Sequence, residues 1–189
     1  VFTKLENGII TGVQTLITLP YGIGSFIMGG LYAVTVVAGI HHMYTLIDLG
    51  QLACYGYTYW LPLASAANVA QGGAALAVAL KSKDTKVKSM ALPSALSACM
   101  GITEPAIFGV NLRFFKPFIA GCIGGGCGAL VCALTSLAAS GTGVTGIFGI
   151  LLCLAQPVQY AIMFAVAALV SFGVSFVLYK DEPKASEQA

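Results

Sequence analysis

One stretch of this sequence limits the possible folds more than any other. Between Pro117 and Tyr179 the chain runs for 63 residues without a charged side chain. A helix that crosses a lipid bilayer needs about 20 predominantly apolar residues. The run therefore has room for two ordinary membrane spans and at most three. We expect its breaks near residues 141–143, which read Gly-Thr-Gly, and at Pro157.

The composition of the whole chain also indicates a membrane protein. Hydrophobic residues make up 58% of the 189 residues and charged residues 8%, and the mean hydropathy is +0.89. A soluble globular protein carries roughly 25% charged residues, which cover much of its surface. The composition excludes a soluble enzyme, a disordered protein and a nucleic-acid binder. We predict an all-α polytopic membrane protein surrounded by membrane lipid.

The lysines predict an orientation in the membrane. Four of the nine basic residues lie between Lys81 and Lys88. Short loops rich in Lys and Arg stay on the cytoplasmic side of a membrane, so we expect this loop to face the cytoplasm. Residues 180–189 form a polar tail that we place on the same side. The sequence thus divides into a membrane domain, residues 1–179, and a polar tail, residues 180–189.

The start of the sequence indicates a longer parent protein. The first residue is Val1 rather than Met, and the residues after it lack the basic segment and the cleavage site of a signal peptide. We therefore expect this chain to be the C-terminal part of a longer protein.

Shorter uncharged segments predict further membrane helices. Residues 24–40 fit one full span. Residues 51–80 form another uncharged run. It opens with four aromatic residues, as an aromatic belt at the edge of a bilayer would: Tyr55, Tyr57, Tyr59 and Trp60.

Two segments contain too many helix breakers for an unbroken span. Residues 89–112 hold two prolines and two glycines, and proline removes a backbone donor and clashes with the preceding turn. Irregular backbone at membrane depth is tolerated only where it is buried in protein or lines a cavity. We expect a re-entrant hairpin with a break at residues 101–104 and a second helix from Pro105. Residues 59–80, broken around residues 68–73, form a second candidate hairpin.

Glu104 is the charged residue most clearly suited to a binding site. A carboxylate near the centre of a bilayer costs roughly 2.5–3.5 kcal/mol, so it normally faces a partner or a water-filled cavity. Thr103 or Glu104 can cap the helix that starts at Pro105, where free backbone N–H groups could hold an anion or a hydroxyl. The alternative is a structural carboxylate that the amides of the hairpin satisfy.

His41 and His42 end an apolar run and are the only histidines. Adjacent helical residues point about 100° apart, so both rarely serve one ligand. His41, Tyr44 and Asp48 share one helical face. On sequence alone, an ordinary hydrogen-bonded histidine at a helix end competes equally with a substrate ligand.

Amides and glycines predict contacts between helices. Asn68 and Gln71 lie three residues apart and could bind a sugar, but amides also join packed membrane helices. The segment 121–128 contains two G-x-x-x-G spacings, Gly121/Gly125 and Gly124/Gly128. Such spacings are typical of closely packed membrane helices.

We expect no metal site and no cofactor. The six cysteines lie in apolar stretches without a C-x-x-C pair, so we interpret them as small hydrophobic side chains. Histidines and carboxylates at the spacing of a helical metal site are missing from the sequence.

Four short motifs resemble one family. Residues 101–109 read Gly-Ile-Thr-Glu-Pro-Ala-Ile-Phe-Gly, and residues 39–44 read Gly-Ile-His-His-Met-Tyr. Both resemble the membrane-embedded C component of Enzyme II of the bacterial sugar phosphotransferase system, within its glucose superfamily. Residues 66–72 and 108–113 resemble the sucrose-type branch of that family.

The resemblance implies a sugar site and its residues. In the family a sugar is bound between re-entrant hairpins by the glutamate of the Glu-Pro motif, here Glu104, and by the motif histidine, here His41 or His42. The sugar then receives a phosphoryl group from a phosphocysteine on a partner B domain. We assign three residues a catalytic role as well as sugar binding: Glu104, His41 and His42. We assign four more to sugar binding: Asn68, Gln71, Thr103 and Asn111.

The resemblance also implies partners and a location. The B domain is absent from this sequence, since no cysteine has the basic, soluble surroundings of a reactive thiolate. The N-terminal spans, through which the family forms a homodimer, are absent too. The expected location is the bacterial cytoplasmic membrane.

Several alternatives remain at this point. Within the family the sugar could be sucrose, trehalose, a β-glucoside or N-acetylmuramate. Outside the family, a secondary transporter would move a sugar without modifying it. A purely structural membrane module would use Glu104 only to hold its hairpin together.

Overall fold

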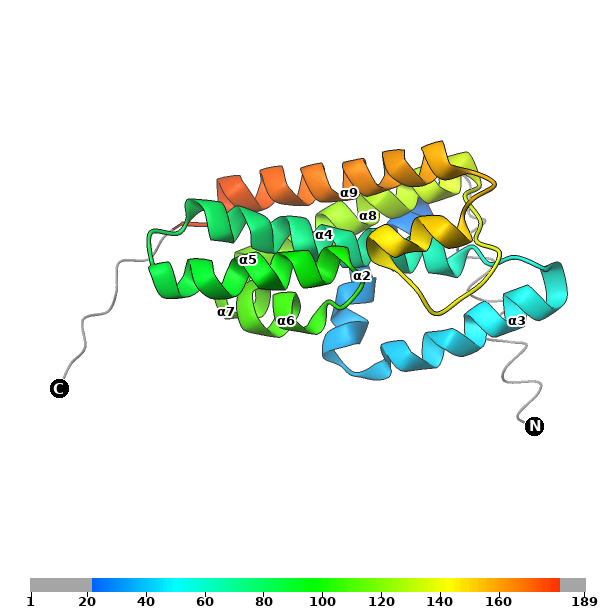
Figure 1. Ribbon diagram of the computed structural model, residues 1–189, viewed down its shortest axis with the longest axis horizontal. Coiled ribbons are helices and arrows are strands. Elements are labelled where there is room, and N and C mark those ends of the chain that lie inside the picture. Colours follow the sequence, from blue (N-terminus) through cyan, green and yellow to red (C-terminus); the bar gives the residue numbers. More distant parts are fainter. Residues whose placement is uncertain (1–21, 181–189) are drawn as a thin grey trace.

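The computed structural model describes residues 22–180, which form a bundle of long helices beside a group of short ones (Figure 1). The elements follow in the order α2 (Ile23–Val37), η2 (Ile40–Tyr44), α3 (Thr45–Tyr55), α4 (Trp60–Lys81), α5 (Thr85–Cys99), α6 (Glu104–Ala106), η3 (Ile107–Asn111), α7 (Leu112–Phe114), α8 (Lys116–Thr135), η4 (Gly146–Leu152) and α9 (Pro157–Leu178). The tail predicted at residues 180–189 lies outside the described residues except for Lys180.

The prediction of an all-helical membrane protein is confirmed in its main features. Three helices, α4, α8 and α9, are long and apolar enough to cross a membrane. The uncharged run from Pro117 to Tyr179 yields two of them, as its length predicted. The break lies where the sequence placed it, because α8 ends at Thr135 and α9 begins at Pro157, with the short helix η4 between them. The span expected at residues 24–40 is α2, which is shorter.

Helix α4 lies at the centre of the bundle and packs against α2, α5, α8 and α9. It is continuous, so the second hairpin predicted within residues 59–80 is wrong. Pro62 is the third residue of α4, where a backbone N–H has no partner within a helix in any case. A Cβ on Gly72 would lie 3.0 Å from a carbonyl oxygen of α5, and one on Gly73 would lie 2.5 Å from a carbonyl oxygen of α9. These glycines admit neighbouring helices and do not interrupt their own.

The glycines of α8 have the same role, as the G-x-x-x-G spacings predicted. A Cβ on Gly124 would lie 2.5 Å from the Cβ of Ser171 in α9. A Cβ on Gly128 would lie 2.9 Å from the Cβ of Ala66 in α4. Because these positions carry no side chain, α8 approaches both helices at backbone distance.

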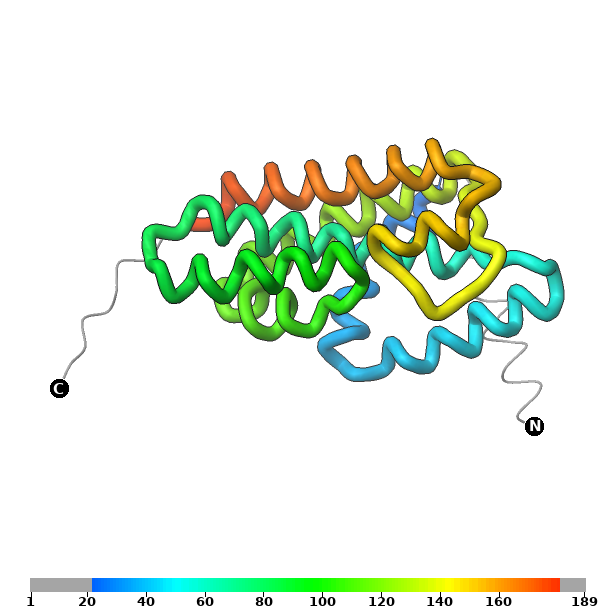
Figure 2. Tube along the Cα trace, in the orientation of Figure 1, coloured from blue at the N-terminus to red at the C-terminus, as the bar shows by residue number. Residues whose placement is uncertain are grey.

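The helix break predicted at residues 101–104 is present. Helix α5 ends at Cys99, Gly101 has a φ of 103°, and the next helical residue is Glu104. The chain then doubles back along α5 through α6, the π-helical turn η3 and α7 (Figure 2). The second arm is therefore three short helical pieces rather than one helix.

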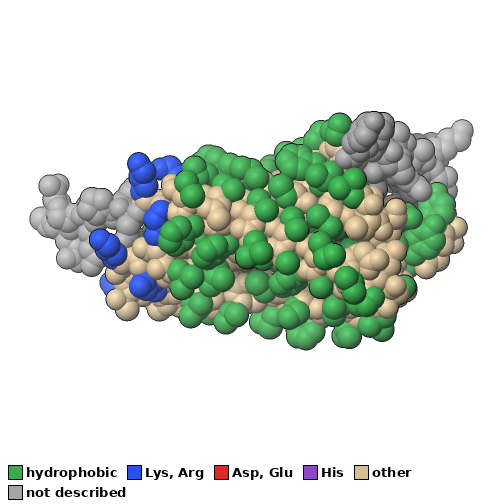
Figure 3. Space-filling view, turned by 90° about the horizontal axis from the view of Figure 1, so that it is seen from above, with side chains coloured by type: hydrophobic (Ala, Val, Ile, Leu, Met, Phe, Trp, Pro, Cys, Tyr) green, Lys and Arg blue, Asp and Glu red, His purple; other side chains and the backbone are tan. Residues whose placement is uncertain are grey.

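The two ends of the bundle differ in chemistry. Lys and Arg side chains gather at one end, and apolar side chains cover much of the long face between the ends (Figure 3). The turn between α4 and α5, which carries the lysines, lies at this end, and the end of α3 lies at the other (Figure 1). Tyr55 and Tyr57 are exposed near the end of α3. Trp60 is only 1% exposed, so its predicted place in an aromatic belt is wrong.

Candidate binding site

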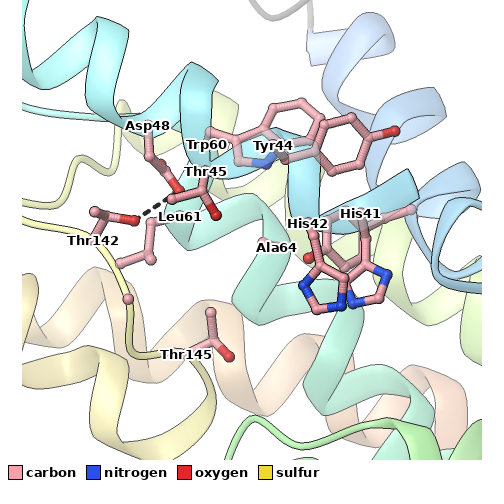
Figure 4. A pocket seen from close by; sticks show the side chains of 12 residues that line it. His41, His42, Tyr44, Thr45, Asp48, Trp60, Leu61, Ala64, Thr142 and Thr145 are labelled. Atoms are coloured by element: carbon pink, nitrogen blue, oxygen red, sulfur yellow. Dashed lines mark hydrogen bonds between the residues drawn. The ribbon is translucent and has the colours of Figure 1, made fainter. Parts of the chain in front are cut away.

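A cavity of about 140 Å³ lies between α2, η2, α3, the start of α4 and the loop that precedes η4. Its wall combines aromatic, imidazole, carboxyl and hydroxyl groups (Figure 4). The lining residues are Tyr32, His41, His42, Tyr44, Thr45, Asp48, Trp60, Leu61, Ala64, Thr142, Gly143 and Thr145. The face that His41, Tyr44 and Asp48 were predicted to share therefore faces this cavity.

The two histidines lie together on one side of the cavity. Gly39, with a φ of 75°, separates α2 from the short 3₁₀-helix η2 that carries them. The two imidazole rings are 3.9 Å apart between centroids, and both line the cavity. The expectation that they point apart is wrong, because these residues do not belong to a regular α-helix. Burial lowers the pKa of His41, the neighbouring His42 lowers it further, and Glu104 opposes both effects. The lowered pKa favours the neutral imidazole of His41.

Glu104 reaches the same place from a distant part of the chain. It begins α6, and its Oε1 atom lies 3.8 Å from Nε2 of His41. Its side chain is 48% exposed, and Glu104 stands beside the cavity rather than in its lining. Thr103 is buried and makes no capping hydrogen bond with its side chain, so its predicted capping role is wrong. The structure brings the predicted carboxylate and histidine together.

Asn68 acts on the cavity through another residue. Its Nδ2 atom donates a hydrogen bond of 3.0 Å to Oγ1 of Thr145, which lines the cavity. The Thr145 hydroxyl in turn donates to the carbonyl oxygen of Gly101 over 3.4 Å. One side chain of α4 thus connects the cavity loop to the helix break that precedes Glu104.

Gln71 and Asn111 pair with each other away from the cavity. Nδ2 of Asn111 donates to Oε1 of Gln71 over 2.7 Å and to its backbone oxygen over 3.0 Å. Both side chains are buried and neither lines the cavity, so they join η3 to α4. This arrangement is the helix-joining alternative that the sequence left open. Sugar binding by these two amides stays a prediction.

The opposite side of the cavity contains a carboxyl group that the site prediction omitted. Asp48 on α3 is 5% exposed. Its Oδ1 atom lies 2.6 Å from the hydroxyl of Thr58, and its Oδ2 atom accepts a hydrogen bond of 2.9 Å from Thr142 (Figure 4). The sequence placed Asp48 on the face of His41, but no motif pointed to it or to the threonines.

Aromatic rings form a third part of the wall. The Trp60 ring meets Tyr44 edge-on at 4.6 Å between centroids and lies 6.2 Å from Tyr32. The buried Nε1 of Trp60 and Nδ1 of His41 have no hydrogen-bond partner among residues 22–180, which the structure describes. Aromatic rings offer an apolar face to a ligand and the polar tips of Tyr and Trp bind its hydroxyls. Unpaired buried donors and acceptors are costly unless a ligand or water satisfies them.

The fold and the cavity define a helical membrane protein with a site suited to a polyhydroxylated ligand. Residues 1–125 match the family model "Phosphotransferase system, EIIC". The chain therefore belongs to this family, as its motifs predicted. The family and the apolar helices together place the chain in a bacterial membrane.

Three curated relatives illustrate the similarity. The chain is 43% identical to a "PTS system sucrose-specific EIIBC component" of Bacillus subtilis and 44% identical to one of Salmonella typhimurium, in each case across 94% of this chain and 40% of the relative. It is 35% identical to a "PTS system trehalose-specific EIIBC component" of Escherichia coli, across 92% of this chain and 36% of the relative. The chain thus spans about 40% of the length of the sucrose-specific relatives. No solved structure matches it.

Proposed function

We propose that this chain is the sugar-binding part of a permease that phosphorylates its sugar during uptake across the bacterial cytoplasmic membrane. The contact of 3.8 Å between His41 and Glu104, beside a cavity with aromatic and hydroxyl walls, carries this proposal. The two residues belong to different motifs and come together only in the folded chain. Their meeting beside the cavity supports a shared role in ligand binding.

The geometry supports a division of labour in phosphoryl transfer. The Glu104 carboxylate accepts hydrogen bonds from sugar hydroxyls and orients the sugar. The neutral His41 takes the proton of the hydroxyl that attacks phosphorus. The phosphocysteine of the B domain loses its S–P bond as the O–P bond to the sugar forms, and the thiolate leaves. Such transfer depends mainly on positioning and on charge stabilisation.

The proposed sugar is sucrose. Three relatives that match this chain at 43–44% identity are named as sucrose-specific, whereas two trehalose-specific relatives match at 35–36%, as does one further sucrose-specific relative at 36%. Trehalose is the alternative. Both are disaccharides with many hydroxyls, so the chemistry of the cavity wall suits either.

We also propose an arrangement in the membrane. The end of the bundle with the lysine-rich turn faces the cytoplasm, and α5 to α7 form a re-entrant hairpin that brings Glu104 to the sugar. The B domain approaches from the cytoplasmic side. A homodimer forms through spans that precede this sequence in the parent protein.

The test uses the full-length parent protein in membranes. We would measure phosphoenolpyruvate-dependent phosphorylation of labelled sucrose by the wild type, by Glu104→Gln and by the control Asp84→Asn. Asp84 caps α5 far from the cavity, and asparagine caps equally well, so the control makes the same chemical change without touching the site. We expect sucrose phosphate from the wild type and the control and almost none from Glu104→Gln.

Other outcomes would contradict parts of the proposal. If Glu104→Gln phosphorylates sucrose as the control does, the site is wrong. If the wild type phosphorylates trehalose but not sucrose, the sugar is wrong. If a sugar enters unmodified and nothing is phosphorylated, a secondary transporter replaces the proposed class.

A further inference from the structure

The hydroxyl of Thr58 lies close to more acceptor oxygens than its single proton can bind. Its Oγ1 atom lies 2.6 Å from Oδ1 of Asp48 and 2.9 Å from Oε1 of Gln51. It also accepts a hydrogen bond of 3.1 Å from the backbone N–H of Trp60. A hydroxyl has one proton to donate and two lone pairs that accept. Two neighbouring oxygens therefore compete for one proton.

The orientation of the Gln51 amide does not remove the conflict. Oxygen and nitrogen of such an amide are assigned from the hydrogen-bond network, and here the backbone N–H of Tyr59 donates to Oε1 of Gln51 over 2.9 Å. Turning the amide over would set its NH₂ group against this N–H. The oxygen of Gln51 thus faces the Thr58 hydroxyl at 2.9 Å, and two oxygens at this distance repel each other unless a proton lies between them.

A second proton, carried by the Asp48 carboxyl, removes this competition. The Asp48 carboxyl then donates to Thr58 and Thr58 donates to Oε1 of Gln51, so the two short O···O contacts each contain a proton. The other carboxyl oxygen, Oδ2, still accepts from Thr142. Asp48 in this form connects α3, the residues before α4 and the loop that holds Thr142.

We propose that Asp48 is a neutral carboxylic acid in this closed arrangement, and that it is a positioning residue that fastens the 142–145 loop to α3 across the sugar cavity. The first half of this inference stands on hydrogen bonds alone. The second half rests on the proposed function, because it takes the cavity to be the sugar site.

The electrostatic surroundings favour the neutral form. The titratable groups around the cavity are Tyr32 of α2, the two histidines and Tyr44 of η2, and Glu104 of α6 beside them. None of these is a permanent cation, and Glu104 is acidic. The described lysines of the 81–88 loop lie at the end of the bundle away from α3. Burial raises the pKa of Asp48 above its ordinary value, and the hydrogen bonds from Thr58, from Thr142 and from the backbone of Leu61 lower it only in part.

The sign of the pH dependence follows from this shift. A raised pKa means that the closed, folded arrangement binds more protons than the open or unfolded chain above pH 3.8, the ordinary value for Asp. Its stability therefore falls as the pH rises towards the raised pKa. Once Asp48 ionises, Thr58 can donate to only one of its two acceptors, so α3 loses part of its attachment to the residues before α4, while Thr142 still donates to Asp48. Sugar affinity should decrease with rising pH.

Asparagine separates the neutral acid from the carboxylate. Its Nδ2 group donates to Thr58 and its Oδ1 accepts from Thr142, so Asp48→Asn reproduces the protonated acid in size and in hydrogen bonds. Asp48→Ala removes the attachment altogether. If the working form were the ionised carboxylate, asparagine would offer Thr58 a donor where an acceptor is required.

The binding experiment uses the full-length parent protein in lipid, with labelled sucrose, between about pH 5 and about pH 9. We expect the wild type to lose affinity as the pH rises. We expect Asp48→Asn to bind sucrose at every pH as tightly as the wild type binds it at acidic pH. We expect Asp48→Ala to bind sucrose about tenfold more weakly than the wild type at acidic pH, across the whole pH range. An Asp48→Asn variant as weak as Asp48→Ala, or a wild type that binds better at high pH, would overturn the inference.

A second measurement separates this inference from the proposed function. The C=O stretch of a protonated carboxylic acid is resolved in the infrared difference spectrum between the wild type and Asp48→Asn. Its presence at neutral pH supports the proton, and its absence overturns it, whatever sugar binds. Conversely, if Glu104→Gln binds sucrose normally while Asp48 behaves as described, the proposed function fails and the proton on Asp48 stands.

Discussion

The packing of α8 against α9 can be tested at one glycine. An added Cβ on Gly124 would lie 2.5 Å from the Cβ of Ser171 and 2.9 Å from the carbonyl oxygen of Ala167. Ordinary contacts of a Cβ lie between 3.4 and 4 Å, so the two helices would have to separate by about 1 Å. The atoms in the way belong to or adjoin the backbone of α9, and no flexible side chain can move aside instead. We therefore expect Gly124→Ala to destabilise the protein.

A second glycine provides the matched control. Gly173 lies on α9, and an added Cβ there would have no atom of another described element within 4 Å. Both substitutions raise helix propensity by about 1 kcal/mol, so this gain cancels when the two variants are compared. Overpacking of a close contact costs about 1–3 kcal/mol. We expect Gly124→Ala to be less stable than Gly173→Ala by that amount.

The assay is denaturant unfolding of the full-length parent protein in detergent, followed by circular dichroism at equal protein and detergent concentrations. The quantity compared is the free energy of unfolding of the two variants. Equal stabilities would refute the packing of α8 against α9 at backbone distance. A Gly173→Ala variant less stable than Gly124→Ala would refute the assignment of the exposed face of α9.

Two further predictions concern the amide pair and the cavity histidine. Replacing either Gln71 or Asn111 with leucine should lower the free energy of unfolding by about 1–3 kcal/mol, because a buried amide loses its partner. The double variant should lose less than the sum of the two, and simple additivity in the double-mutant cycle would contradict the pairing. Because burial lowers the pKa of His41 below 6.5, the sucrose phosphorylation rate should stay high at neutral pH. As the pH is lowered, the rate should begin to fall only below about pH 6.5. A rate that already falls on going from higher pH down to pH 7 would contradict a neutral His41.

Sequence patterns located the features that follow from a residue's own geometry. The break before Glu104 was predictable because Gly101 and Pro105 lie within one short segment, and both residues interrupt a regular helix. The close approach at Gly124 and Gly128 was predictable because the spacing puts both glycines on one helical face. The contact between His41 and Glu104 was predicted in a different way, because that prediction rested on family resemblance and not on residue spacing.

Other features depend on partners that the local sequence does not reveal. Gly72 and Gly73 indicated a broken helix, yet they mark places where the backbones of α5 and α9 come close to α4. A glycine inside an apolar run can either break its helix or allow another helix to pack closely. Only the positions of the neighbouring helices distinguish the two cases. Asp48 was left out of the site for a related reason. Its importance comes from Thr58 and Thr142, and no periodicity connects those positions with it.

The two sides of the cavity are held in place by different forces. Helix α4, which supplies Trp60 and Leu61, is buried along most of its length, so displacing it would expose apolar surface along the whole bundle. Helix α3 buries three residues, and two of these are the polar Asp48 and Gln51. Its attachment thus depends largely on hydrogen bonds, each of which contributes about 0.5–1.5 kcal/mol. A change in the shape of the cavity therefore costs less at α3 than at α4, and the proton on Asp48 is the part of the attachment of α3 that pH can alter.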